Sequence, residues 1–230
     1  RASRHLRRVR RKARMPAKSQ IRKRLETGLT RLGLAVVPRL PRGAVLALAR
    51  ALGTAGYVLS ARDRRLGRAN LDLAFGGTKT AAEKRRILRK SLQNFALVTL
   101  DLLWFTRDSA ARMERWFEAG PSMKATMARK AARVGVTGHF GNWELVGRHW
   151  AMSPGGLMSV AMPLKNPEVD ELLRQARQIS GQQIVEREGA LRKLVKFLRE
   201  GGTVGLLLDQ NTDPDEGGVF AEFFGKPVAV

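Results

Sequence analysis

The most constraining feature of this chain is a strand, a glycine-containing turn and a helix start packed into residues 134–147. The run Val134–Thr137 is rich in β-branched residues, which favour an extended strand. Gly138 and Gly141 then interrupt the pattern, and apolar residues recur at helical spacing from Glu144 onward. A strand that leads through a tight turn into a helix is typical of α/β proteins, in which such units repeat around a parallel sheet.

Two titratable side chains lie close together in this sequence: His139 is inside the turn, and Glu144 is at the expected helix start. On one continuous helix their spacing would leave them about 140° apart, so they can meet only if His139 lies in the turn. A carboxylate at a helix N-terminus is favoured by the helix dipole, and by accepting one imidazole proton it would leave the other nitrogen as a base. The backbone amides of Gly141 and Asn142 would be available to an oxyanion. A structural role for the two side chains is the alternative.

The rest of the C-terminal half alternates in the same way. We expect strands at 157–162, 183–185 and 203–208, and helices at 166–180 and 189–200. Each expected strand is followed by a chemically distinctive residue: His139, Pro163, Arg187 or Asp209. Because parallel strands end at one edge of a sheet, we expect these residues to share that edge. The predicted fold class is α/β, with a mainly parallel sheet flanked by helices.

The N-terminal half is predicted to be helical and strongly basic. Helices are expected at 21–37, 43–60, 80–105, 109–117 and 122–132. Residues 1–68 hold 20 Lys and Arg against two acidic residues, a net charge of +18, whereas the remaining residues contribute only +5. This asymmetry predicts an anionic partner, either a lipid surface or nucleic acid. The basic region lacks interleaved aromatic residues, which argues against nucleic acid.

Composition excludes several kinds of chemistry. The 230 residues include no cysteine and three histidines, which excludes a thiolate nucleophile and disfavours a metal site built from several histidines. No Gly-x-Ser-x-Gly motif is present, so a covalent acyl-enzyme has no evident serine nucleophile. The longest apolar stretch, residues 43–61, is interrupted by Arg50, whereas a spanning helix needs ~20 apolar residues. We expect no metal or redox cofactor, and helices that lie on a membrane rather than cross it.

The turn resembles the His-x4-Asp/Glu motif of the bacterial lipid A biosynthesis acyltransferases. The matching residues are Gly138-His-Phe-Gly-Asn-Trp-Glu144, and the similarity extends from about residue 40 to Val230. Supporting segments are Arg68–Phe75, Pro163–Asp170, Ile184–Arg187, Leu207–Asn211 and Gly218–Pro227. One position departs from the family: Met162 stands where an arginine is usual, so a binding role of that arginine is in doubt or moves to Lys165 or Arg187.

The resemblance implies a glycerolipid-acyltransferase-like enzyme on the cytoplasmic face of a bacterial inner membrane. It would move a fatty acyl group from an acyl carrier protein or CoA thioester to a hydroxyl of a glycolipid, most simply a lipid A precursor in lipopolysaccharide biosynthesis. His139 would take the hydroxyl proton and Glu144 would orient the imidazole. The residues expected to bind substrate are Lys165, Arg187, Asp209 and Gln210. Another polar lipid, such as a phosphatidylinositol mannoside, is the alternative acceptor, and a basic nucleic-acid-binding protein is the remote alternative.

We expect three regions along the chain. Residues 1–24 form a basic arm that is expected to be disordered or loosely helical, residues 25–132 a helical, membrane-associating region, and residues 133–230 the α/β acyltransferase core. Because the family pattern normally runs further, we also expect the natural protein to continue beyond Val230. The segment Phe220–Phe224 resembles the family's loop that closes over the site.

Overall fold

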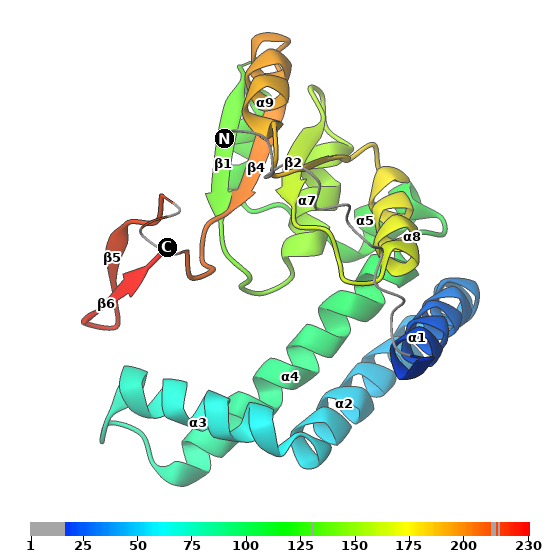
Figure 1. Cartoon of the computed structure of the whole chain (residues 1–230). Helices are drawn as coiled ribbons and strands as arrows, with labels where there is room; N and C mark the ends of the chain where they lie inside the picture. The colour runs from blue at the N-terminus through cyan, green and yellow to red at the C-terminus, as the bar shows by residue number, and fades with distance from the viewer. Residues whose placement is uncertain (1–16, 130, 213–214, 216) are drawn as a thin grey trace, which may run out of the picture.

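The structure is a computed structural model that describes residues 17–129, 131–212, 215 and 217–230. Figure 1 shows a helical N-terminal region beside an α/β core. The helical region comprises α1 (Ala17–Val36), the 3-10 turn η1 (Val37–Arg39), α2 (Arg42–Leu59), α3 (Ala61–Phe75), α4 (Ala81–Trp104), α5 (Ser109–Trp116) and α6 (Pro121–Ala128). The core comprises β1 (Arg133–Thr137), α7 (Trp143–Ala151), β2 (Leu157–Ala161), α8 (Pro167–Gln178), β3 (Gln183–Glu186), α9 (Ala190–Arg199) and β4 (Thr203–Leu207).

The core is built on a parallel four-stranded sheet with the order β1-β4-β2-β3, which confirms the predicted α/β class. Successive side chains of a strand point to opposite faces. On β2, Met158 packs with Leu194 and Phe197 of α9, whereas Leu157 lies against Gly147 of α7. Helices α7 and α9 therefore cover opposite faces of the sheet.

All four strands end at one edge of the sheet. Thr137 at the end of β1 pairs in register with Leu207 at the end of β4, and Ala161 of β2 pairs with Glu186 of β3. In Figure 1 the arrowheads of β1 and β4 point toward the helices α3 and α4. The loops that leave the strands consequently lie between the core and the helical region, as expected for residues that were predicted to share an edge.

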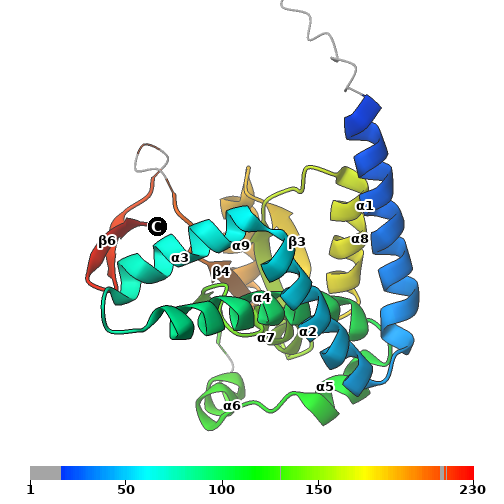
Figure 2. The same cartoon turned by 90° about the horizontal axis from the view of Figure 1, so that it is seen from below.

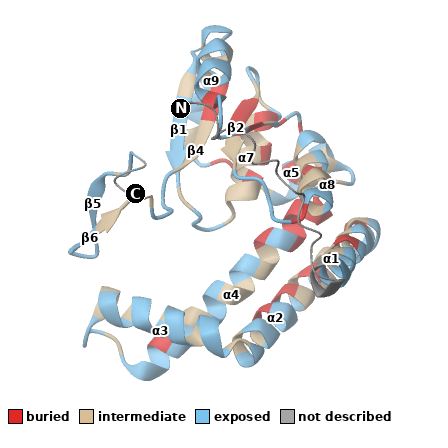
Figure 3. Cartoon of the chain, viewed as in Figure 1, coloured by how far each residue is buried: buried red, intermediate tan, exposed pale blue. Residues whose placement is uncertain are grey.

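Helix α4 is the long element on which the helical region is assembled. It begins with a capping box, in which Thr80 and Glu83 satisfy each other's backbone amides. Helix α2 runs so close to it that a Cβ on Gly53 would lie 2.3 Å from the Cα of Gln93. The second half of α4 is buried in a cluster that also contains Val45 of α2 and Leu145 of α7. Figure 3 shows this burial where α4 reaches the core. The two regions therefore have a buried apolar cluster in common.

Helix α1 is joined to the core through Asn166, which is only 6% exposed. The Asn166 side-chain amide donates to the Lys23 carbonyl at 2.9 Å and to the Thr27 hydroxyl at 3.3 Å. Its carbonyl oxygen accepts from the Glu168 amide and caps α8. Figure 2 shows α1 and α8 side by side, and the two helices are in contact. One residue thus starts a core helix and anchors the first described helix of the chain.

Three parts of the chain differ from the sequence-based expectations. Helix α1 begins at Ala17, four residues before the helix expected from residue 21, and residues 1–16 lie outside the described part of the chain. Helix α3 was not predicted, because its apolar residues are divided between two sides: Leu66 and Leu73 are exposed, whereas Leu71 and Phe75 are half-buried. The segment expected as a closing loop is an antiparallel hairpin of β5 (Phe220–Phe223) and β6 (Lys226–Ala229). At its tip, the Phe224 ring packs on Phe75 of α3 at 5.2 Å.

Among the described helices, none on its own has both the length and the apolar composition to cross a membrane. Helices α2 and α3 pass that test only as a pair, and they meet with a bend of 91°.

Candidate active site

His139 and Asp209 meet at the carboxyl edge of the sheet. They follow β1 and β4, which are hydrogen-bonded neighbours, and the Leu208 amide donates to the Thr137 carbonyl just before them. The Nδ1 of His139 lies 2.8 Å from Oδ1 of Asp209. The His139 backbone amide donates to Oδ2 of the same carboxylate at 2.6 Å. One carboxylate therefore fixes both the ring and the backbone of His139.

The residue before His139 has to be glycine for this contact to form. A Cβ on Gly138 would lie 2.9 Å from Oδ2 and from Cγ of Asp209. A Cβ carbon does not approach other atoms that closely, so any larger residue would push Asp209 away from the imidazole. Gly138 thus serves the contact between two strands rather than only the turn.

Glu144 does not contact the imidazole as the sequence interpretation required. Its carboxylate accepts from Nε of Arg177 at 3.0 Å and from Nη2 at 2.7 Å. The two side chains are 12% and 25% exposed, so the ion pair is largely withdrawn from solvent. The pairing of His139 with Glu144 is corrected to a pairing with Asp209, because adjacent strand ends bring His139 and Asp209 together while α7 carries Glu144 toward α8.

The electrostatics of Asp209 suit the contact with His139. Partial burial acts to raise the pKa of Asp209, but the hydrogen bonds from the His139 ring and backbone outweigh it and leave that pKa below its ordinary value of 3.8. The carboxylate is therefore ionised at neutral pH and accepts the Nδ1 proton. In that tautomer the Nε2 of His139 carries the lone pair, which is the arrangement of an oriented base.

The turn after His139 is held in place by α4. Gly141 has a φ of +61°, and its carbonyl accepts from the Asn94 side chain at 3.0 Å. The Asn142 Oδ1 caps α7 by accepting from the Leu145 amide, and its Nδ2 donates to Asp101 at 2.7 Å. Within the described chain, the backbone amides of Gly141 and Asn142 donate to no protein acceptor. An anion could therefore accept hydrogen bonds from these two amides.

The sequence matches a known protein family over most of its length. A profile described as bacterial lipid A biosynthesis acyltransferase matches residues 15–230. The chain belongs to this family. It is therefore an acyltransferase, and at the level of the family its pathway is lipid A biosynthesis. No curated protein matches the sequence.

Apolar side chains surround the site of this acyltransferase on loops at the same edge. Phe140, next to His139, is 91% exposed. Met162 and Leu164, which follow β2, are 62% and 46% exposed, and Leu208 after β4 is 53% exposed. Trp143 packs its ring against the His139 imidazole at 4.9 Å. Such a collection of exposed apolar groups around one imidazole is suited to an apolar substrate.

The polar residues predicted to bind substrate are spread along the same edge. Gln210 directly follows Asp209, and Lys165 and Arg187 follow β2 and β3. The sheet order places β2 beside β4 and β3 at the far edge, so Arg187 lies two strands away from Asp209. Loops that follow three of the four strands thus each carry one of these polar residues. In the described part of the chain, no three His, Asp or Glu side chains gather as metal ligands.

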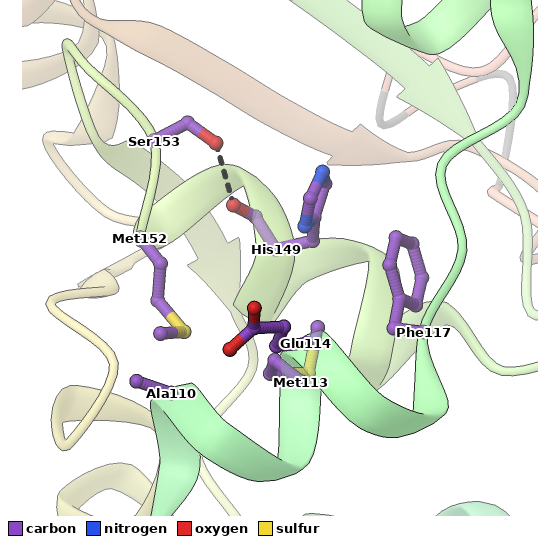
Figure 4. Close-up of a pocket in the computed structure, with 7 residues that line it drawn as sticks. All are labelled: Ala110, Met113, Glu114, Phe117, His149, Met152 and Ser153. Atoms are coloured by element: carbon purple, nitrogen blue, oxygen red, sulfur yellow. Dashed lines mark hydrogen bonds between the residues drawn. The ribbon is translucent and has the colours of Figure 1, made fainter.

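A pocket of about 220 Å³ lies at the other end of α7. Figure 4 shows it between α5 and α7, lined by Ala110, Met113, Glu114, Phe117, His149, Met152 and Ser153. Helix α7 has nine residues and is roughly 13 Å long at 1.5 Å per residue, so this pocket is remote from His139. Burial lowers the pKa of His149 below its ordinary value of 6.5.

Sequence reasoning missed three residues that support the site: Asp101, Asn94 and Arg177. Asp101 did leave a signal, since it is a single charge inside the apolar run from Leu100 to Trp104. Arg177 and Asn94 left none, because each acts through a contact with a residue more than 30 positions away.

Proposed function

We propose that the chain transfers a fatty acyl group from a carrier thioester to a hydroxyl of a membrane glycolipid, most simply a lipid A precursor. The observation that carries this proposal is the contact of His139 with Asp209 at an edge rimmed by exposed apolar side chains. A base alone would fit many reactions, whereas a base among apolar groups fits an acyl donor. The family membership adds that the reaction is acyl transfer.

In this proposal the Nε2 of His139 takes the proton of the acceptor hydroxyl, while Asp209 keeps Nδ1 protonated. The alcohol oxygen attacks the thioester carbonyl, and the negative charge on the carbonyl oxygen is held by the amides of Gly141 and Asn142. Collapse of this intermediate breaks the carbon–sulfur bond, and the thiol leaves with the proton from the imidazolium. No residue becomes acylated.

The remaining predicted site residues take supporting roles. Glu144, which the family motif suggested as the partner of the imidazole, instead supports the site indirectly by fixing the start of α7 through Arg177. Lys165, Arg187 and Gln210 would bind anionic or hydroxyl groups of the two substrates along the strand ends. The donor is proposed to be an acyl carrier protein or CoA thioester.

We further propose that the helical region lies on the anionic cytoplasmic surface of the bacterial inner membrane. Helix α1 carries an apolar stripe that is exposed along its length: Ile21, Leu25, Leu29, Leu32 and Val36 are 44–68% exposed. These residues recur at helical spacing, and basic residues flank them. The apolar stripe would enter the interface, and the basic groups would meet anionic headgroups.

The test of the enzymatic proposal is acyl transfer with purified protein in vesicles. Labelled acyl-carrier-protein and acyl-CoA donors are each offered with a lipid A precursor or a phosphatidylinositol mannoside, and the products are identified by mass spectrometry. We expect an ester on the lipid A precursor that is absent with His139→Ala. Transfer only to the mannoside would replace the acceptor, and no transfer to any glycolipid by folded protein would refute the proposal.

Membrane attachment is tested by flotation with vesicles. Binding to anionic vesicles should fall steeply as salt rises, because exposed charges are screened over about 8–10 Å at moderate ionic strength. Equal binding to neutral and anionic vesicles at low salt would contradict the electrostatic part. Tight, sequence-selective DNA binding would instead support the nucleic-acid alternative.

A further inference from the structure

Asp101 is a fully buried carboxylate in the last turn of α4, with 0% exposure. It forms a two-pronged ion pair with Arg42 at the start of α2, in which Nη1 contacts Oδ1 and Nη2 lies 3.2 Å from Oδ2. Oδ2 also accepts from Nδ2 of Asn142 at 2.7 Å. A buried charge is stable only when it is paired and hydrogen-bonded, so these three side chains hold one another in a defined arrangement.

The arginine end of this arrangement is rigid. The Arg42 guanidinium lies 5.0 Å from the ring centre of Trp104, 5.8 Å from that of Phe105 and 5.9 Å from that of Trp116. Aromatic faces attract a guanidinium and restrict its movement. Arg42 is therefore a fixed support for Asp101 rather than a mobile surface charge.

The asparagine end reaches the active-site turn. Asn142 uses its oxygen to cap α7, and capping needs only this acceptor, which Asp or Ser would supply as well. The Nδ2 of Asn142 is not needed for the cap, and it donates to Asp101. About two helical turns earlier on α4, Asn94 donates to the carbonyl of Gly141. Two side chains of one helix thus hold two consecutive residues of the turn that carries His139.

We propose that Asp101 and Asn94 are positioning residues, through which α4 sets the turn from His139 to Asn142 in its reactive geometry. This inference rests on the proposed acyl transfer for its kinetic consequence. The held segment contains the amides of Gly141 and Asn142 proposed to bind the oxyanion. A misplacement of about 1 Å in such groups can cost roughly 100-fold in rate. The helical region thereby contributes to catalysis without touching the reacting atoms.

The decisive variant is Asn142→Asp, which keeps the cap, removes the donor to Asp101 and places a second carboxylate against it. The exchange Asp101→Asn with Asn142→Asp reverses donor and acceptor and restores one hydrogen bond with the same total charge. Asn166→Asp is the matched control, because Asn166 also caps a helix with its oxygen and donates to another helix, α1. Asn94→Ala removes an exposed hydrogen bond and leaves the fold intact.

Hydrogen–deuterium exchange of residues 138–145 reports on the turn whether or not the acyl acceptor is known. We expect faster hydrogen exchange there in Asn142→Asp and in Asn94→Ala. Protection should return in the double variant Asp101→Asn with Asn142→Asp, and Asn166→Asp should not change the exchange of this turn. Unchanged protection in folded Asn142→Asp and in Asn94→Ala would overturn the proposal. Absence of transfer by the wild-type protein would refute the proposed function alone, since the exchange result stands apart from it.

Kinetics give the second readout. We expect kcat to fall about 10- to 100-fold in Asn142→Asp, with KM values within about threefold of wild type, because the turn orients groups that act in the transition state. If Asn142→Asp lowers kcat about 100-fold, the double variant Asp101→Asn with Asn142→Asp should have a kcat at least about tenfold higher than the single variant. Asn166→Asp should stay within about threefold of wild-type kcat. A wild-type kcat in both Asn142→Asp and Asn94→Ala, or an equal loss in Asn166→Asp, would overturn the positioning role.

Discussion

The two ends of helix α7 place a histidine in opposite surroundings. Just before its N-terminal end, His139 lies on an open turn with its Nδ1 2.8 Å from a carboxylate oxygen. At its C-terminal end, His149 stacks on Phe117 at 4.5 Å, and its Nε2 is buried without a hydrogen-bond partner in the described chain. A carboxylate partner orients an imidazole as a base, whereas burial alone only keeps it neutral. The partner, and not the residue type, separates a candidate catalytic histidine from a structural one.

The largest expected effect separates the two histidines by activity. His139→Ala should lower acyl transfer at least about 100-fold, since a positioned acid–base group contributes roughly 10²–10⁴-fold. His149→Ala should lose stability through the emptied pocket but keep transfer within about threefold. Initial rates at saturating donor, normalised to folded protein, measure both. Near-normal turnover of His139→Ala would show that the histidines do not differ in the way described.

The next prediction compares two carboxylates: that of Asp209, which contacts His139, and that of Glu144, which pairs with Arg177. Asp209→Asn should lower transfer by about 100-fold or more, because an amide does not enforce the Nδ1-protonated tautomer. Glu144→Gln should lower transfer less, by about tenfold, while breaking a largely buried ion pair and costing about 3 kcal/mol of stability. Transfer rates and urea unfolding test the pair. A larger kinetic loss for Glu144→Gln would restore the sequence-based pairing of Glu144 with the imidazole.

Two glycines sharpen the comparison without touching a charged group. A Cβ on Gly138 would press on the Asp209 carboxylate at 2.9 Å, whereas a Cβ on Gly147 within α7 would meet Leu157 at an ordinary 3.6 Å. Gly138→Ala should therefore lower transfer about tenfold. Gly147→Ala should leave transfer unchanged and raise stability by about 0.5 kcal/mol, the usual gain in a helix interior. Equal activity of the two variants would mean that Asp209 can shift without loss.

The smallest effect is a pH dependence of stability that comes from His149. Burial lowers its pKa in the folded protein, so below pH 6.5 the unfolded chain binds more protons than the folded one. This contribution to stability is complete above pH 6.5 and is lost as the pH falls through the folded-state pKa. Urea unfolding at pH 7.5 and 5.5 should show a smaller decrease for His149→Gln than for the wild type. An identical decrease would place the missing partner of Nε2 in solvent.

The sheet could be predicted from the sequence because its signals are local. Two strands can be recognised in the sequence by β-branched and apolar residues with glycines at one end: Val134–Thr137 and the strand that ends before Asp209. Parallel strands share an edge, so the meeting of His139 with Asp209 was within reach of the same argument. That argument did place both residues at one edge, but Glu144 was chosen as the partner of the imidazole because a familiar motif spacing favoured it, and motif spacing does not give the order of strands in a sheet.

The supporting contacts could not be predicted, because they depend on the packing of distant elements. Arg177 reaches Glu144 only because α8 lies next to α7, and Asp101 reaches Asn142 only because α4 crosses the start of α7. Helix α3 escaped detection for a different reason: its leucines lie on both its exposed and its half-buried sides, so its sequence shows no single apolar face.

The anchoring of α1 by Asn166 has a consequence for synthesis of the chain. The hydrogen bonds from Asn166 to Lys23 and Thr27 join residues that are 143 and 139 positions apart. At roughly 5–20 residues per second, a ribosome adds the intervening segment in about 7–28 s. During that interval α1 emerges with its apolar stripe and its basic groups but without α8 to pack against. The helix that would first meet a membrane is thus also the helix whose place in the fold is completed late in translation.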